Sequence, residues 1–377
     1  MKYYIIAGEA SGDLHGSNLI LALQKLDSKA EVRGWGGDKM AAAGARLAKH
    51  YRDLAFMGFV EVLTHLRIIL KNLAFCKHDI LQYQPDALIL VDYPGFNLRI
   101  AKWAHEQGIK VVYYIAPQVW AWKENRVPAM KRTIDRMLVI LPFEQSYFER
   151  KFNWRVDYVG HPLVGVVQDF KKEQPIEGKE SDFFQHLNGK RIVAVLPGSR
   201  KQEIRKKLPL MLSMARHFPD CQFVVAKAPA LEDSFYAPFL ATHQNIKAVS
   251  GMTYSLLMHA DAAMVTSGTA TLETALFGVP EVVCYKGNPV SYQIARRLIK
   301  VKYISLVNLI MDRQVVEELI QDDFNEPNLK SALTRLLDDE QSRGRLMSDY
   351  RELTIKLSSG GNASMNAARK IYSFICP

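Results

Sequence analysis

The sequence is poor in cysteine and has no long apolar run. Its 4 cysteines are Cys76, Cys221, Cys284 and Cys376. This scattered spacing fits neither a disulfide framework nor a zinc site. No stretch approaches the roughly 18 uninterrupted apolar residues that a membrane span requires. The first apolar run ends at Ala7, and Glu9 and Asp13 follow it, which argues against a signal peptide. These absences predict a cytoplasmic protein.

Compositional bias and internal repetition are also absent. Hydrophobic residues make up 48% of the 377 residues and charged residues 23%, the balance of an ordinary globular protein. No similarity recurs at a period of about 20–50 residues, which excludes a solenoid. At roughly 150 residues per domain, the length predicts two or three domains.

The chain carries an excess of positive charge. Lysine and arginine total 49 against 39 acidic residues, a formal net charge of +10. Such an excess favours an anionic partner, which can be a nucleic acid, a phosphorylated substrate or a membrane surface. Charge alone therefore leaves open a non-enzymatic nucleic-acid-binding protein. No nucleic-acid-binding motif accompanies the charge, so we expect no nucleic acid partner.

Short apolar runs alternate with longer helical patterns along the whole chain. They occupy residues 3–7, 32–35, 87–92, 111–116, 137–141 and 156–159 in the first half, and 192–196, 223–226, 262–266, 282–285 and 303–307 in the second. Such runs predict buried parallel strands in βα units. We expect two doubly wound, Rossmann-like α/β domains that face each other across a cleft, with ligands bound at the carboxyl ends of the strands.

A polar, charge-rich stretch at residues 168–190 separates the two series of strands. It is typical of a linker followed by a short surface helix, and the alternative is a long surface loop within one domain. We place a first domain at residues 1–167, a second at 168–341 and terminal helices at 342–377.

The first strand runs into the turn Gly8-Glu9-Ala10-Ser11-Gly12-Asp13. Small residues there let backbone N–H groups approach a ligand at a helix N-terminus. The alternative is a plain tight turn in which Asp13 is a cap. The turn is not a G-x-G-x-x-G fingerprint, which disfavours a nicotinamide dehydrogenase.

Asp92 ends a strand whose preceding residues are all apolar. A carboxylate at that position suits a general base if burial raises its pKa. Alternatively, Asp92 accepts hydrogen bonds from the next loop or caps its helix. Residues 113–122 then place Gln118, Trp120 and Trp122 after another strand, where aromatic faces cover a sugar or acyl chain, or simply pack in the core.

Two strand ends in the second half suit a nucleotide diphosphate. Residues 197–200 form a small turn with Arg200, which supplies a fixed positive charge; the alternative is an exposed arginine paired with Glu203. Ser267, Gly268 and Thr269 form a second small-residue turn. Glu273 follows one helical turn later, from where it can reach ribose hydroxyls.

Residues 57–75 combine apolar residues at helical spacing with basic residues at the edges. This pattern fits an interfacial helix that contacts lipid, or a core-facing amphipathic helix. The candidate lipid contacts are Phe59, Val62, Leu63, Leu66, Ile69 and Leu70.

Taken in order, these motifs resemble the lipid-A-disaccharide synthase family of GT-B glycosyltransferases over essentially the whole chain. The motifs lie at residues 8–13, 57–63, 92–97, 116–122, 160–162, 196–200, 267–273 and 305–309. The resemblance implies transfer of a sugar from UDP-2,3-diacylglucosamine to 2,3-diacylglucosamine 1-phosphate, giving the lipid A disaccharide 1-phosphate and UDP. It also implies inversion at the anomeric carbon without a metal or other cofactor.

The resemblance assigns roles to individual residues. Asp92 would be the catalytic base, and the first domain would bind the acceptor and lipid. The second domain would bind the UDP-sugar, and Glu9, Ser11, Gly12, Asp13, Gln118 and Trp120 would contact the sugars. The nucleotide and diphosphate would contact Gly198, Ser199, Arg200, Ser267, Gly268, Thr269, Glu273 and Asn308. A second acidic residue common in the family's aspartate loop is replaced here by Gly95, so no role for that carboxylate transfers.

Acylated substrates would make residues 57–75 a membrane contact and place the protein peripherally on the anionic inner face of the inner membrane. In the family, the terminal helices return to the first domain and can be exchanged between the subunits of a homodimer. A sugar-nucleotide 2-epimerase of the same fold is the nearest alternative function.

Overall fold

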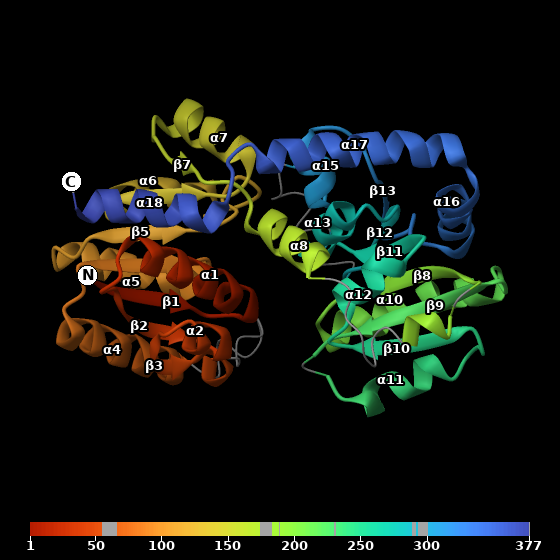
Figure 1. Ribbon diagram of the computed structural model, residues 1–377, viewed down its shortest axis with the longest axis horizontal. Helices are drawn as coiled ribbons and strands as arrows, with labels where there is room; N and C mark the ends of the chain where they lie inside the picture. The colour runs from red at the N-terminus through yellow and green to blue at the C-terminus, as the bar shows by residue number, and fades with distance from the viewer. Residues whose placement is uncertain are drawn as a thin grey trace. The chain divides into compact units, whose positions relative to one another are not determined.

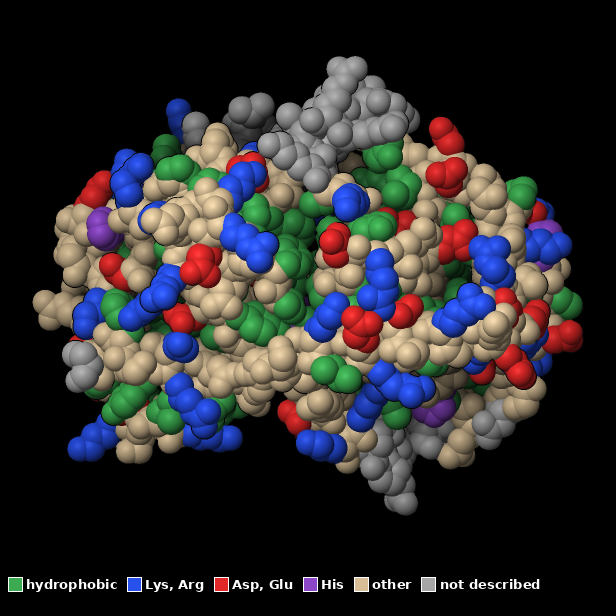
Figure 2. All heavy atoms as spheres, turned by 90° about the horizontal axis from the view of Figure 1, so that it is seen from above, with side chains coloured by type: hydrophobic (Ala, Val, Ile, Leu, Met, Phe, Trp, Pro, Cys, Tyr) green, Lys and Arg blue, Asp and Glu red, His purple; other side chains and the backbone are tan. Residues whose placement is uncertain are grey.

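The computed structural model describes residues 1–54, 66–173, 183–187, 189–229, 231–288, 292 and 301–376. The chain divides into two compact units (Figure 1). Unit 1 comprises Met1–Pro162 and Leu357–Pro377, and unit 2 comprises Leu163–Lys356. On the face seen in Figure 2, Lys and Arg side chains are interspersed with Asp and Glu over both units.

Unit 1 is built on a seven-stranded parallel sheet with the order β3-β2-β1-β4-β5-β6-β7. The strands are β1 (Lys2–Ala7), β2 (Glu31–Gly36), β3 (Arg46–His50), β4 (Ala87–Val91), β5 (Val111–Tyr114), β6 (Arg136–Val139) and β7 (Asp157–Tyr158). Side chains of β1 alternate between two cores: Tyr4 and Ile6 pack on one face, and Tyr3 and Ile5 on the other. Burial on both faces explains why the central strands are continuous apolar runs.

Helices cover both faces of this sheet. They are α1 (Ala10–Leu26), α2 (Asp38–Ala42), α4 (Leu66–Tyr83), α5 (Pro94–Glu106), α6 (Val127–Thr133), α7 (Pro142–Phe152) and α18 (Ala363–Ile375). The last of these comes from the far end of the chain and packs beside α1. Ala367, Ala368 and Ile371 of α18 are buried in the same core as Tyr3 and Ile5.

Unit 2 contains a six-stranded parallel sheet with the order β10-β9-β8-β11-β12-β13. Its strands are β8 (Arg191–Leu196), β9 (Cys221–Lys227), β10 (Ile246–Ser250), β11 (Ala262–Thr266), β12 (Glu281–Tyr285) and β13 (Glu317–Ile320). Its helices are α8 (Pro162–Lys172), α10 (Lys201–Ser213), α11 (Asp233–Leu240), α12 (Thr253–His259), α13 (Thr269–Phe277), α15 (Leu306–Met311), α16 (Glu326–Asp338) and α17 (Glu340–Ser358).

The two sheets reverse direction at corresponding places. In unit 1 the first strand, β1, lies between β2 and β4, and in unit 2 the first strand, β8, lies between β9 and β11. Each unit is therefore a doubly wound α/β domain, which confirms the predicted fold class. Ligands of such sheets bind where the strand order reverses, beyond the carboxyl ends of the two central strands.

Three of the four differences from the predicted strands have a common cause. Strands β3, β10 and β13 escape the sequence pattern because each is an edge strand and more polar than the buried centre. The predicted strand at residues 303–307 is wrong, because Ser305 caps α15 by accepting a hydrogen bond from Asn308 N. Its apolar residues pack in a loop and a short helix.

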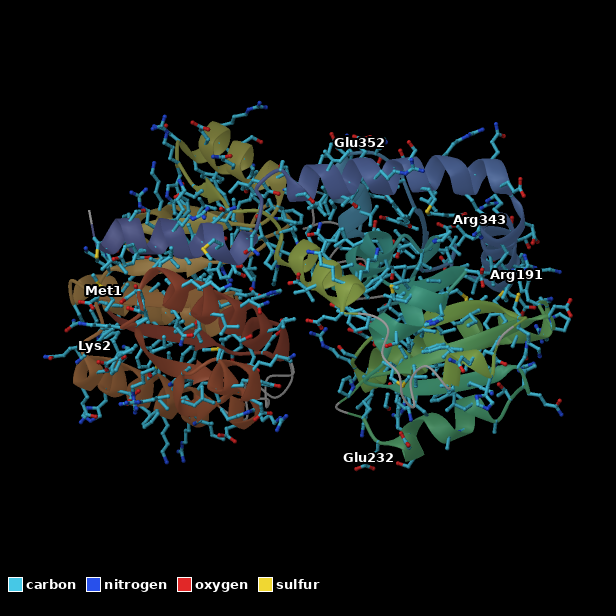
Figure 3. The ribbon with its side chains drawn as sticks, viewed as in Figure 1. Met1, Lys2, Arg191, Glu232, Arg343 and Glu352 are labelled. Atoms are coloured by element: carbon cyan, nitrogen blue, oxygen red, sulfur yellow. The ribbon has the colours of Figure 1, made fainter. Side chains whose placement is uncertain are left out.

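The terminal helices divide between the units, whereas the sequence analysis assigns residues 342–377 together. Helix α17 is fastened to unit 2, since Arg313 donates to Asp349 and Glu352 at 2.7 Å each. Arg343, labelled in Figure 3, donates to Leu336 O at 2.6 Å. Only the segment after Lys356 returns to unit 1.

A buried carboxyl group beneath α17 gives a test of this packing. Glu281 is fully buried, its Oε1 accepts from Tyr350 Oη at 3.4 Å, and burial raises its pKa well above the usual value. Stability from such a group is present below its unfolded pKa and lost as pH rises. We predict that Glu281→Gln increases the free energy of unfolding at pH 8 by about 1–3 kcal/mol, the scale of an unsatisfied buried charge.

The gain of Glu281→Gln should vanish near pH 4, as measured by urea unfolding at both pH values. The control is Glu340→Gln. Glu340 is exposed at the first residue of α17, the helix that covers Glu281, and its replacement should change neither value. A loss of stability at pH 8 would contradict the assignment.

Candidate active site

Asp92 lies at the carboxyl end of β4, beside the end of β1, because Val91 is paired with Ala7. Asp92 and Tyr93 both adopt left-handed backbone conformations, with φ of 45° and 50°. Tyr113 Oη donates to Asp92 O at 2.6 Å and Asn97 Nδ2 donates to it at 2.8 Å. Strained residues that are held this firmly cluster at functional sites.

The carboxyl group of Asp92 is tuned by its surroundings. Burial, and after it the negative charge of Glu9, raise its pKa to about 6, while the Tyr93 backbone N–H opposes the shift. A carboxyl group that titrates near 6 is ionised at neutral pH and is a stronger base than an ordinary aspartate. This is the property that a general base requires.

The turn after β1 packs against the loop of Asp92. Of its predicted sugar contacts, some are exposed and others are buried. A Cβ on Gly8 would lie 2.3 Å from the ring of Tyr93, so only glycine lets that ring cross the end of β1. Glu9 and Ser11 are exposed at the start of α1. Gly12 is buried against Ala7.

Asp13 has a structural task. It is 3% exposed, and its carboxylate accepts from the backbone N–H groups of Gly37, Lys39 and Met40 at 2.7–3.1 Å. These bonds hold the turn between β2 and α2. The cap reading of Asp13 fits this arrangement, and we leave Asp13 and buried Gly12 out of the sugar-contacting set.

The segment after β5 presents Gln118 and Trp122 to solvent but buries Trp120. Trp120 is 8% exposed and its Nε1 donates to Glu144 Oε1 at 3.0 Å. Its ring packs edge-on against Phe143 at 5.0 Å. Trp120 therefore belongs to the packed interior of this segment, and its ring does not present an open face to a sugar.

Sequence reasoning missed Glu144. Its second carboxylate oxygen accepts from Ile140 N and Leu141 N at the start of α7. Burial raises its pKa to about 7, and the charge of Asp92 contributes in the same direction. Its position three residues after Leu141, at the third residue of α7, was the available signal for a capping role.

In unit 2, the two predicted diphosphate turns converge. A pocket of about 470 Å³ is lined by the ends of β8 and β11 and the first residues of α10 and α13. The lining includes Gly198, Ser199, Arg200, Ser267, Gly268 and Thr269. Two helix N-termini and an arginine facing one cavity make an anion site.

The two glycines of this pocket are required by the backbone. Gly198 has φ of 105° and Gly268 of 145°, regions that side chains rarely adopt. The guanidinium of Arg200 is 81% exposed and pairs with Glu203 at 3.1 Å, so it is available to a ligand at little desolvation cost. Lys207, another residue that the sequence analysis missed, is buried under this turn and donates to Thr266 Oγ1.

Glu273 and Asn308 do not line the pocket. Glu273 accepts from Tyr254 Oη at 2.6 Å, and burial raises its pKa. Asn308 is 0% exposed; its side chain donates to Val316 O and Glu318 and accepts from two backbone N–H groups. The side chain of Asn308 thus stabilises a loop. In this structure it does not face the pocket that is predicted to bind the diphosphate.

Glu318 links Asn308 to the pocket. Its carboxylate accepts from Ile304 N, Ser305 N and Asn308 Nδ2 at 2.9–3.2 Å. Ser267 Oγ in turn donates to Ile304 O at 2.8 Å. A polar network therefore runs from the buried Asn308 to a residue that lines the cavity.

We predict that Asn308→Ala and Asn308→Asp each lower the free energy of unfolding by about 1–3 kcal/mol, because buried partners lose their hydrogen bonds. The aspartate also places a second carboxylate beside Glu318. In a double-mutant cycle measured by urea unfolding, Glu318→Gln should recover part of the Asn308→Asp loss and none of the Asn308→Ala loss. Unchanged stability with lower UDP affinity would instead make Asn308 a ligand contact.

The predicted lipid contacts are only partly described. Phe59, Val62 and Leu63 lie outside the described residues, and Leu66 opens α4. Ile69 is 7% exposed and faces the core, contrary to its predicted lipid contact, whereas Leu70 is 57% exposed. Ile68 of the same helix is also exposed.

Within the described ranges, no group of three or more His, Cys, Asp or Glu side chains is placed to hold a metal ion. None of the helices in the described part of the chain is both long enough and apolar enough to cross a membrane.

Comparison with known proteins identifies the family. Residues 3–371 match the family model described as lipid-A-disaccharide synthetase. The chain belongs to the lipid-A-disaccharide synthase family. The lipid-A-disaccharide synthase of Geobacter sulfurreducens is 39% identical over 367 residues, covering 96% of this chain and 94% of the relative. That of Nitrosococcus oceani is 38% identical, covering 96% and 93%. The resemblance on which the residue roles rest is therefore confirmed.

Solved structures show how the family's fold relates to others. The UDP-GlcNAc 2-epimerase from Neisseria meningitidis bound to UDP-GlcNAc aligns with a TM-score of 0.66 at 14% identity over 100% of both chains. The calicheamicin glycosyltransferase CalG4 aligns with a TM-score of 0.60 at 18% identity, over 100% of this chain and 98% of that one. These likenesses confirm the GT-B fold of this lipid-A-disaccharide synthase family member.

Proposed function

We propose that the protein is an inverting glycosyltransferase of lipid A biosynthesis. It transfers the sugar of UDP-2,3-diacylglucosamine to the 6-hydroxyl of 2,3-diacylglucosamine 1-phosphate, and the products are the β-1,6-linked disaccharide 1-phosphate and UDP. The observation that carries the proposal is family membership over residues 3–371. The geometry of the two strand-order reversals supports it.

On the donor side, the pocket of unit 2 holds the diphosphate. Backbone N–H groups at the start of α10 and α13 and the guanidinium of Arg200 stabilise the charge that develops as UDP leaves. Glu273, one helical turn after Thr269, accepts from the ribose hydroxyls with the oxygen that Tyr254 does not use. Asn308 acts through Glu318 and the pocket wall.

On the acceptor side, Asp92 takes the proton of the attacking hydroxyl. The hydroxyl oxygen forms a bond to the anomeric carbon while the bond from that carbon to the diphosphate oxygen breaks, so one displacement inverts the centre. Exposed Glu9, Ser11 and Gln118 lie just after strands β1 and β5 of the same sheet, Ser11 in the first turn of α1, and we assign them to the sugar hydroxyls.

We further propose that the enzyme works peripherally on the inner face of the inner membrane, as a monomer or homodimer. Helix α4 carries exposed apolar residues, Ile68 and Leu70, together with the basic residues Lys71 and Lys77. This combination suits the surface of a membrane, where the interior is apolar and the lipid headgroups are anionic. The net charge of +10 acts in the same direction.

The role of Asp92 is tested by replacing its carboxyl group. We predict that Asp92→Asn lowers kcat by about 10²–10⁴, the range that general base catalysis contributes, while UDP affinity stays unchanged. Product formation by mass spectrometry and UDP binding by calorimetry give the two values. Equal loss of both would make Asp92 structural, and absence of product with the native enzyme would refute the function itself.

The charge of Glu9 predicts a shift in pH dependence. Since Asp92 must be ionised, kcat/KM should rise with pH and level off above about 6, the pKa of Asp92. Glu9→Gln removes a negative charge that raises this pKa, so the acidic limb should move to lower pH. Ser11→Ala removes a proposed sugar contact without removing a charge and is the control: its kcat/KM falls at every pH, but its acidic limb should lie at the same pH as that of the native enzyme. A shift to higher pH would contradict the assignment.

The exposed face of α4 predicts membrane attachment. The double substitution of Ile68 and Leu70 by serine should reduce binding to phosphatidylglycerol vesicles at least about tenfold, because each buried aliphatic side chain contributes about 1.5–3 kcal/mol. The matched control replaces Leu21 and Ile355, which are exposed to a similar or greater extent on other helices, and should bind as the native protein does. Equal sedimentation of all three would return α4 to a purely structural role.

The epimerase alternative shares only the fold. Incubation with UDP-N-acetylglucosamine and no acyl acceptor distinguishes it, since an epimerase would change the configuration at C2 and release no UDP.

A further inference from the structure

A groove in unit 1 begins directly beyond Asp92 and has no place in the function described so far. It has a volume of about 610 Å³ and runs between α5 and α6. Pro94 and Gly95, the first two residues of α5, line one end. Because three residues span at most about 10 Å, this end of the groove lies close to the proposed base.

The groove combines an apolar floor with a basic rim. Leu98, Ala129 and Met130 contribute apolar surface. Four cationic side chains also line it, namely Arg99, Lys102, Arg126 and Arg132. Glu106 and His105 complete this polar part of the lining. Glu106 is paired with Lys102 at 4.0 Å, and within the described part of the chain Arg99, Arg126 and Arg132 have no carboxylate partner.

Arg126 ties this rim to the catalytic loop. It is partly buried, and its positive charge opposes the rise in the pKa of Tyr113 that burial and Asp92 produce. Tyr113 Oη is the group that donates to Asp92 O. Arg126 thus acts electrostatically on the residue that supports Asp92, and it lines the same groove as Pro94 and Gly95, which follow Asp92 closely in the chain.

We propose that this groove binds the acceptor, with its 1-phosphate held by Arg126 and its neighbours and an acyl chain on the floor. The proposal rests on the proposed function, which requires an acylated sugar phosphate whose 6-hydroxyl meets Asp92. C1, which carries the phosphate, and C5, which carries the 6-hydroxymethyl group, both flank the ring oxygen, so the phosphate lies within one sugar unit of the hydroxyl that meets the base.

The chemistry of the groove matches this occupant in each part. Arginine forks bind phosphate by paired charge-assisted hydrogen bonds. The N-terminus of the 13-residue α5 faces the same end and adds a favourable dipole. A Cβ on Gly95 would meet nothing within 4 Å, so the entrance is open. The apolar floor removes hydrocarbon from water.

The test compares two acceptors that differ only in the 1-phosphate. With saturating donor in mixed micelles, KM is measured for 2,3-diacylglucosamine 1-phosphate and for the same sugar with a free 1-hydroxyl. Arg126→Gln, and separately the pair Arg99→Gln with Arg132→Gln, should raise KM about tenfold for the phosphorylated acceptor, the scale of one charge-assisted hydrogen bond. KM for the dephosphorylated acceptor and UDP affinity should stay unchanged.

Arg155→Gln is the matched control, since Arg155 is an exposed arginine of unit 1 that does not line the groove. Equal effects of a groove variant on both acceptors, or no effect on either, would overturn the proposal. Loss of binding to phosphatidylglycerol vesicles without a change in acceptor discrimination would also overturn it and make the rim a contact for anionic lipid headgroups.

Calorimetric binding of both acceptors without donor separates this proposal from the proposed function. The native protein can form no product yet bind the phosphorylated acceptor more tightly than the dephosphorylated one, with a preference that Arg126→Gln removes; this supports the groove as the acceptor site and refutes the proposed reaction. If product forms and Arg126→Gln binds both acceptors as the native protein does, the reaction is supported and the groove is not the acceptor site.

Discussion

Parallel pairing of β1 with β4 and of β8 with β11 is the constraint on which both candidate sites depend. In each sheet the chain starts at the centre, winds outward to one edge, and returns to pair with the other side of the first strand. The loops after the two central strands have no crossover helix between them, so polar residues in those loops meet. Asp92 beside Gly8, and Gly198 with Gly268 around one cavity, are results of the same winding.

The sequence pattern predicts the central strands of each sheet but misses edge strands, and the reason is physical. Central strands are buried on both faces and must be apolar throughout, so they are visible as runs of Val, Ile and Tyr. Edge strands such as β10 and β13 are solvated on one side, and their polar residues resemble a loop. The run at residues 303–307 is apolar, yet it forms a loop and the start of α15, and apolarity alone does not distinguish such a segment from a strand.

Site residues divide in the same way. Gly198, Arg200 and Asp92 were predictable because strand ends and backbone geometry restrict what can stand there. The roles of Asp13 and Glu318 were not, because each carboxylate accepts from backbone N–H groups that are distant in the sequence. A carboxylate that binds such distant N–H groups fixes a loop without any local sequence signal, whereas Glu144 had one in its place three residues after Leu141. Asn308 belongs with Asp13 and Glu318, although the family resemblance pointed to a ligand contact.

The path of the chain through the two units has a consequence for biosynthesis. Unit 1 needs α18 to cover the apolar surface beside α1, yet α18 follows all of unit 2 in the chain and is therefore synthesised after it. At roughly 5–20 residues per second, the intervening unit takes on the order of ten seconds or more to synthesise. During that interval the core of unit 1 beside α1 lacks its cover, so the first half of the chain cannot complete its folding until the second half has been made.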